Sequence, residues 1–202
     1  MTQQRAEETR ERILNAALHS FAEHGYDAAG VAEICRRAGV SKGAFYHHFP
    51  TKQTLFLALL EEWLQGIDAQ LASRRAHASN IPEALRDMSS LMDVVLHEAR
   101  GQLPLFLEFL SQAARDPTVW EATIAYYRRY HRYFTEMIDA GIIEGSIQPA
   151  EADIIAWVVL SFAVGLLLQG VLESEGADWG KIARQGMEIL LMGIMKNQCR
   201  SI

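Results

Sequence analysis

Apolar residues recur at steps of three and four positions along almost the whole chain, and this spacing constrains the fold more than any other feature. In the first such segment, Ile13, Leu14, Ala17, Leu18 and Phe21 would share one side of a helix. No convincing run of alternating apolar and polar residues, the pattern of a half-buried strand, is present. The sequence therefore predicts an all-α fold.

Turn-forming residues divide this pattern into nine expected helices. Gly25 followed by Tyr26 predicts a glycine stop of the Schellman type, with Tyr26 touching Phe21. Gly101 and Pro104 bracket a break further along the chain. The later helices are expected over 51–72, 82–96, 105–114, 117 to 141 or 145, 151–173 and 179–197.

Two short helices lie between the first helix and the fourth. The first covers 31–38, Gly39 makes a turn, and Ser41 is a plausible N-cap for a second that runs to about Phe49, where Pro50 ends it. Helix, short helix, turn and short helix within about 50 residues is the arrangement of a helix-turn-helix DNA-binding domain.

The third helix has two different faces. At about 100° per residue, Phe45 and Phe49 share one face, and Gly43 and His47 point the opposite way. The small Gly43 would let the backbone approach the floor of a DNA groove. One face therefore resembles a core, and the other offers hydrogen-bond donors.

Charge is distributed unevenly along the chain. Residues 1–52 hold seven Lys and Arg against six Asp and Glu, whereas the remaining residues hold twelve against nineteen, a net charge of −7. Between Glu33 and Glu61 there is no acidic residue. This local basic region is compatible with phosphate binding, but a solvated helix face is the simpler explanation of the charge pattern alone.

At these residues the sequence resembles the tetracycline-repressor (TetR) family of regulators. The resemblance covers residues 10–60 and rests on FxxxGY at 21–26, RRAGVSKG at 36–43 and FYHHFPTK at 45–52. It implies two domains, a helix-turn-helix domain over 1–50 and an effector-binding and dimerisation domain over 51–202. It also implies a homodimer that reads a palindromic operator on double-stranded DNA, expected to be a repressor released by a small molecule. The two widely separated cysteines, Cys35 and Cys199, fit no disulfide framework and favour a cytoplasmic location.

Site residues follow by matching positions of the family motif. The residues expected at DNA, with Tyr46 and Lys52 on phosphates, are Ser41, Lys42, Gly43, Ala44, Tyr46, His47, His48 and Lys52. Gly30 departs from the family, which often has a phosphate-contacting Thr there, so Gly30 is not expected to contact DNA. Ala44 likewise replaces a common Thr and leaves at most an apolar contact.

The effector site is expected among large apolar and aromatic side chains of the later helices. His131 lies in a stripe of apolar residues, where it is either a hydrogen-bonded core histidine or a polar group lining a cavity. The acidic balance favours a neutral or cationic ligand. The candidate lining residues are Trp63, Met88, Met92, Phe109, Tyr127, Tyr130, His131, Phe134 and Trp157.

Two later helices are more apolar than a single core requires. Residues 154–168 approach the length of a membrane span but fall short of about 18 unbroken apolar residues, and acidic residues flank both ends. A helix that is apolar all round is more often buried on both sides, so we expect no membrane contact. We expect instead that these two helices form a four-helix bundle with the same helices of a second copy. The candidate interface residues are Phe162, Gly165, Gln169, Met187, Leu190, Leu191 and Ile194.

Other classes of protein are less favoured. The sequence contains no P-loop or Gly-rich dinucleotide turn, and the histidines lack metal-ligand spacing. We therefore expect no enzymatic activity, no cofactor and no metal. The competing hypothesis is a helical carrier of apolar small molecules that does not bind an operator strongly.

Overall fold

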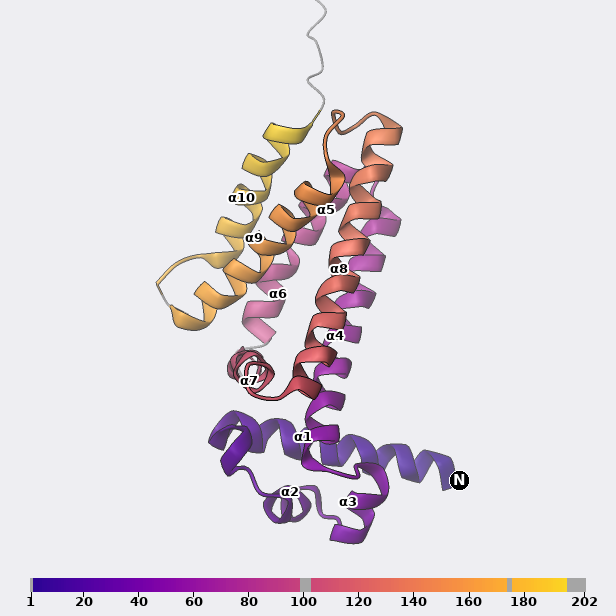
Figure 1. Ribbon diagram of the computed structural model, residues 1–202, viewed down its shortest axis with the longest axis vertical. Coiled ribbons are helices and arrows are strands. Elements are labelled where there is room, and N and C mark those ends of the chain that lie inside the picture. Colours follow the sequence, from indigo (N-terminus) through magenta and orange to yellow (C-terminus); the bar gives the residue numbers. More distant parts are fainter. Residues whose placement is uncertain (1, 99–102, 174–175, 196–202) are drawn as a thin grey trace, which may run out of the picture. The chain divides into compact units, whose positions relative to one another are not determined.

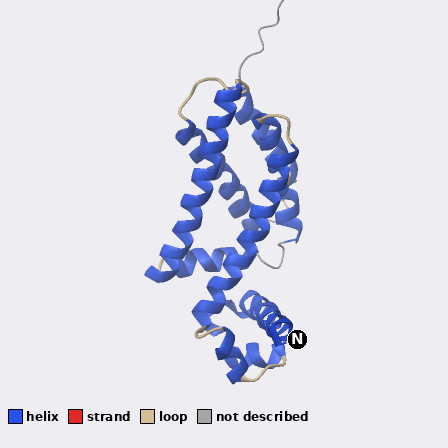
Figure 2. Ribbon diagram, turned by 90° about the vertical axis from the view of Figure 1, so that its right-hand side faces the viewer, coloured by secondary structure: helices blue, strands red, loops and turns tan. Residues whose placement is uncertain are grey.

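The computed structural model describes residues 2–98, 103–173 and 176–195, and these fold into helices labelled α1 to α10 (Figures 1 and 2). Strand pairing in this part of the chain is limited to an isolated bridge between Ile147 and Met195. The prediction of an all-α fold is confirmed. The expected helix over 82–96 is interrupted at Ser90 and forms two short helices. If these two are counted as one, the number of helices in the described residues equals the predicted nine.

The described structure divides into two compact units, each formed by two stretches of the chain. The first comprises residues 1–67 and 100–123, and the second comprises 68–99 and 124–202. The predicted boundary at residue 50 separates only the N-terminal helices, whereas the first unit also contains the start of α4 and all of α7. Tertiary packing, rather than chain order, decides this grouping.

The first unit contains α1, α2, α3 and α7, together with the first parts of α4 and α8. Their bounds are α1 (Thr2–Ala28), α2 (Val31–Ala38), α3 (Lys42–His48), α4 (Lys52–His77), α7 (Leu103–Ala113) and α8 (Pro117–Glu144). In Figures 1 and 2 the short helices α2 and α3 lie on the same side of α1. Phe21 packs edge-on against Phe56 with ring centroids 5.4 Å apart, and Tyr26 lies 4.6 Å from the same ring. An aromatic cluster thus joins α1 to α4.

Glycines end α1 and α2 in different ways. Gly25 has φ 74° and ψ 169°, which interrupts α1 without the left-handed geometry of a Schellman stop, although the predicted contact of Tyr26 with Phe21 is present at 5.6 Å. The Schellman pattern lies instead at Gly39, with φ 64° and ψ 39°, where Val40 N–H donates to the Cys35 carbonyl. Gly39 therefore sets the turn before α3.

The second unit contains the last part of α4, most of α8 and four further helices. These are α5 (Ile81–Ser89), α6 (Leu91–Glu98), α9 (Ala152–Leu172) and α10 (Trp179–Ile194). Helix α10 packs on α5, α6 and α9, and α6 also packs on α9. Gly186 of α10 lies against the Phe162 ring of α9, since any Cβ at Gly186 would collide with that ring. The small residue therefore lets the two helices approach closely.

Candidate nucleic-acid interface

Helix α3 is fixed by its aromatic face and by a cap. Phe45 is fully buried and Phe49 is 4% exposed, as the sequence predicts. The Ser41 hydroxyl accepts a hydrogen bond from Ala44 N–H at 3.1 Å, which satisfies one free donor at the start of the helix. A helix of only seven residues is marginal by itself, so these contacts hold it in place.

The opposite face of α3 is open to solvent. Ala44 and His48 are half-buried at its edges, and Tyr46 is 50% exposed. The predicted residues that are exposed are Ser41, Lys42, Gly43, Tyr46 and His47. The predicted orientation of the helix is therefore confirmed, and its contact with DNA remains a prediction.

The half-buried Lys52 side chain is directed toward the end of α1. It donates to the carbonyls of Tyr26 at 2.7 Å, Ala29 at 3.2 Å and Asp27 at 3.3 Å, and it lies 4.4 Å from the centre of the Tyr26 ring. A cation at the C-terminal carbonyls of α1 is favourable because those groups lack helical partners. The structure thus gives Lys52 a structural role, and the predicted phosphate contact would require it to leave these carbonyls.

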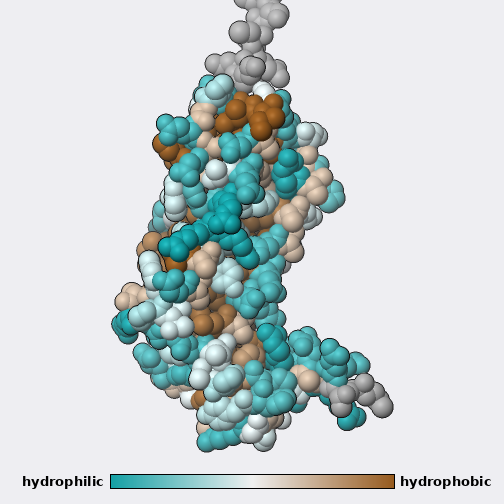
Figure 3. Space-filling model, turned by 45° about the vertical axis from the view of Figure 1, so that its right-hand side comes forward, coloured by the Kyte–Doolittle hydropathy of each residue, from teal (hydrophilic) through white to brown (hydrophobic). Residues whose placement is uncertain are grey.

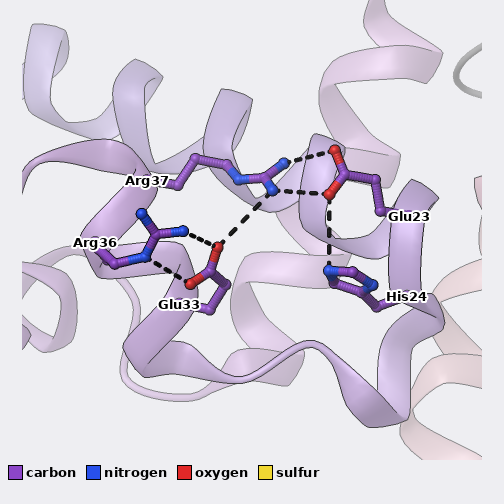
Figure 4. Close-up of polar contacts among 5 residues, drawn as sticks. All are labelled: Glu23, His24, Glu33, Arg36 and Arg37. Carbon is purple, nitrogen blue, oxygen red and sulfur yellow. Dashed lines mark hydrogen bonds and ion pairs between the residues drawn. The ribbon is translucent and has the colours of Figure 1, made fainter.

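Arg36 and Arg37 are held in an ion-pair cluster with Glu23, His24 and Glu33 (Figure 4). Arg37 makes two hydrogen bonds to Glu23, at 2.7 and 3.0 Å, which tie α2 to α1. Arg36 makes two to Glu33, at 2.6 and 2.8 Å. These bonds hold the pKa values of Glu23 and Glu33 below their usual range. Much of the basic region read from the sequence is therefore neutralised by carboxylates.

The start of α2 lacks the side-chain cap present at α3. Gly30 is the N-cap of α2 and adopts an extended conformation with φ −86° and ψ 143°, but no side chain accepts a hydrogen bond there. Its carbonyl accepts from the N–H of Ile34 at 3.1 Å. The departure from the family at this position therefore leaves the geometry of the cap intact and removes only the hydroxyl.

The candidate effector residues are divided between the two units. Trp63 belongs to the first unit, and the side chain of Phe109 lies outside the described part of the structure. The remaining candidates belong to the second unit, where Met88, Met92 and Phe134 are buried, Tyr127, Tyr130 and His131 are half-buried, and Trp157 is 46% exposed. Burial raises the pKa of Tyr127. Burial, followed by a hydrogen bond to Asp68, raises the pKa of Tyr130.

His131 has close neighbours on α9. Its ring stacks on Trp157 with centroids 4.0 Å apart, and its Nε2 lies 3.2 Å from the Asp153 carbonyl and 3.4 Å from Asp153 Oδ1. With 15% of its side chain exposed, His131 links α8 to α9. These contacts correspond to the hydrogen-bonded histidine among the two alternatives, and they do not exclude a ligand beside the same ring.

The predicted dimer residues divide into buried and exposed groups. Met187 is 5% exposed and Leu191 is fully buried, so these two cannot contribute to an interface, because they have almost no surface to bury. Phe162, Gly165, Leu190 and Ile194 are half-buried and Gln169 is exposed. The sequence does not separate these groups, because apolar residues occur on both sides of α10.

The exposed apolar residues of α9 and α10 form two regular stripes, which we call the apolar face. On α9 the exposed apolar residues are Ile154, Val158, Leu168 and Leu172, and the exposed Ser161 and half-buried Gly165 continue the spacing of four and three residues between them. On α10 the stripe runs through Ile182, Ile189 and Met192, which are 38%, 70% and 75% exposed. Elsewhere the surface is mixed, and Figure 3 shows one side on which hydrophilic residues surround separate hydrophobic areas.

Helix α9 is the one helix among the described residues that is long and apolar enough to cross a membrane. Its most apolar window is 28% buried within the protein. It packs on α6 and α10. Within the described residues, His, Cys, Asp and Glu form no group of three arranged to hold a metal ion.

Comparison with known proteins assigns the family. Residues 13–59 match the model of bacterial regulatory proteins of the tetR family, and residues 83–191 match the C-terminal model of BetI-type transcriptional repressors. The HTH-type transcriptional regulator UidR of Escherichia coli K12 is 29% identical over 198 residues, 96% of each protein. The HTH-type transcriptional repressor AcnR of Corynebacterium diphtheriae is 34% identical over 119 residues, 59% of this chain and 57% of AcnR.

A solved structure gives the same assignment for the fold. A transcriptional regulator from Saccharomonospora viridis, in complex with choline, superposes with a TM-score of 0.78 at 21% identity, covering 94% of this chain and 99% of that one. The matching family models and relatives describe transcription factors rather than enzymes. The chain therefore belongs to the TetR family of bacterial regulatory proteins and is a DNA-binding transcriptional repressor.

Proposed function

We propose that α3 enters the major groove of an operator and reads bases through its exposed face. The observation that carries this proposal is the division of α3 into the buried Phe45 and Phe49 and the exposed Lys42, Tyr46 and His47. A short helix held by one face can place the other against base edges. Gly43, which has no side chain, allows close approach of the backbone.

The protein acts as a homodimer joined by the apolar face. Steps of four and three residues on α9, and of seven and three on α10, match the seam of a helical bundle. Two such helices from each of two copies would form a four-helix bundle around a two-fold axis. Two copies of α3 would then read a palindromic operator, with half-sites about one helical turn, or a multiple of it, apart.

A small molecule bound by the second unit releases the operator. The net charge of −7 over residues 53–202 favours a neutral or cationic ligand, and the choline bound by the S. viridis regulator is a cation. Candidate contacts are Tyr127, Tyr130 and His131 on α8. Since α4 belongs to both units, we expect it to transmit the change by favouring one of two conformations.

Selection of bound sequences from random duplex DNA tests this function. With the full-length protein we expect a palindromic sequence to be enriched and to bind more weakly as salt increases. A later screen of neutral and cationic small molecules should find compounds that release the duplex. Enrichment of no sequence, together with tight binding of apolar molecules, would support the carrier hypothesis instead. Because the operator lies on DNA, we place the protein in the cytoplasm.

A further inference from the structure

Only part of the positive charge that the family motif places near α3 is available to DNA. Lys42, at the start of α3, is exposed, but Arg36 and Arg37 are each bonded twice to a carboxylate, and Lys52 donates to three carbonyls. Affinity for DNA depends on cations that neutralise phosphates. Cations outside the motif can therefore add to the contribution of Lys42.

Arg12 of α1 lies beside the turn that precedes α3. A Cβ built on Gly39 would be 3.9 Å from Arg12 Nη1, which places the guanidinium against this turn. Its Nη2 donates to the Thr9 hydroxyl at 3.5 Å. Arg12 is exposed. Because the Thr9 hydroxyl is uncharged, this hydrogen bond does not neutralise the guanidinium.

Arg10 lies at the other end of α3. Its guanidinium carbon is 5.8 Å from the centre of the Phe49 ring, and Phe49 is the C-cap of α3. Its ion pair with Glu7 is a single contact of 3.6 Å between exposed side chains, which contributes little. In Figure 1 the N-terminal half of α1 runs alongside α3. The two arginines therefore place cations near both ends of the helix that reads DNA.

We propose that Arg10 and Arg12 bind phosphates of the DNA backbone on either side of the groove that α3 enters. Arginine forms paired hydrogen bonds to phosphate oxygens, and contacts with the backbone orient a reading helix without selecting a sequence. The pair lies in α1, outside the helix-turn-helix formed by α2 and α3. It extends the DNA interface to the N-terminal part of α1, which precedes the residues 13–59 matched by the family model.

The test measures DNA affinity of the full-length protein as a function of salt, on the selected operator and on a random duplex. Each of Arg10→Gln and Arg12→Gln should weaken binding to both duplexes. Because the proposed dimer carries two copies of each arginine, each change should reduce the slope of log K against log salt by about 1.8, and the double variant should reduce it by about 3.6. Arg12→Lys, which retains the charge, should keep the slope of the unmodified protein.

Arg36→Gln is the matched control, because its guanidinium is bound to Glu33 rather than free for phosphate. It should leave the slope unchanged. Since Arg10 also covers Phe49, Arg10→Met retains the apolar contact and removes only the charge; its slope should fall like that of Arg10→Gln. An unchanged slope in the double variant, with operator binding intact in the unmodified protein, overturns this proposal and leaves the proposed function standing.

Discussion

The segment α1–α3 and the helix pair α9–α10 differ in how far their large apolar side chains are exposed to solvent. In α1–α3 the rings of Phe21, Phe45 and Phe49 are at most 4% exposed, and polar groups cover the outside. In α9–α10, Leu172, Ile189 and Met192 are at least 70% exposed. The first arrangement completes a core within one chain, whereas the second leaves exposed apolar surface, which the proposed dimer would cover.

The largest loss of stability is expected when the aromatic core of α1–α3 is disrupted. Phe45→Ala should destabilise the first unit by about 3–5 kcal/mol, because a fully buried aromatic ring is replaced by a cavity. DNA binding should be lost while the second unit still associates. Hydrogen exchange, resolved along the chain, measures this. Phe134→Ala is the control in the second unit, and it should increase exchange there instead.

Placing charge on the apolar face tests the other side of the comparison. Ile189→Glu with Met192→Glu should give folded monomers and reduce operator affinity on the order of 100-fold or more, since two linked half-sites bind far more tightly than one. Sedimentation and operator titration measure the two effects. Ile143→Glu alters a side chain that is 87% exposed on α8, and it should leave both unchanged. A variant that remains dimeric would show that the interface lies elsewhere.

Lys52→Met should destabilise the first unit by about 1–2 kcal/mol, because three carbonyls at the end of α1 lose a charged donor. Thermal unfolding measures the stability, and the slope of DNA affinity against salt separates two roles for this residue. If Lys52 acts only within the fold, the slope stays constant. A decrease of about 1.8, from the two copies in the proposed dimer, would instead confirm the phosphate contact that the sequence predicts.

The smallest effect concerns the N-cap of α2. Gly30→Ser should stabilise the first unit by about 0.3 kcal/mol, because serine supplies the missing acceptor and a Cβ at this position meets no atom within 4 Å. The new hydroxyl could also donate to a phosphate, so that DNA affinity should rise slightly. Calorimetry and DNA titration measure the two changes. Gly145→Ser is the contrasting change and should destabilise, because Gly145 has φ 81°.

Much of the fold follows from local patterns in the sequence. Spacing of three and four residues predicts the helices, Ser41 and Pro117 mark where two of them begin, and the positions of Phe45 and Phe49 predict which face of α3 is buried. These features depend on neighbours within one helical turn, so a single sequence contains them. The motif around α3 likewise predicts the family.

Other features depend on residues that are distant in the sequence. Helix α9 is apolar all round, so its pattern cannot indicate which side packs on α6 and α10. The charges of Arg37 and Lys52 count as basic in the sequence, but Glu23 and the carbonyls at the end of α1 engage them in the structure. Local periodicity determines where helices form, and only tertiary packing decides which of their faces and charges remain available.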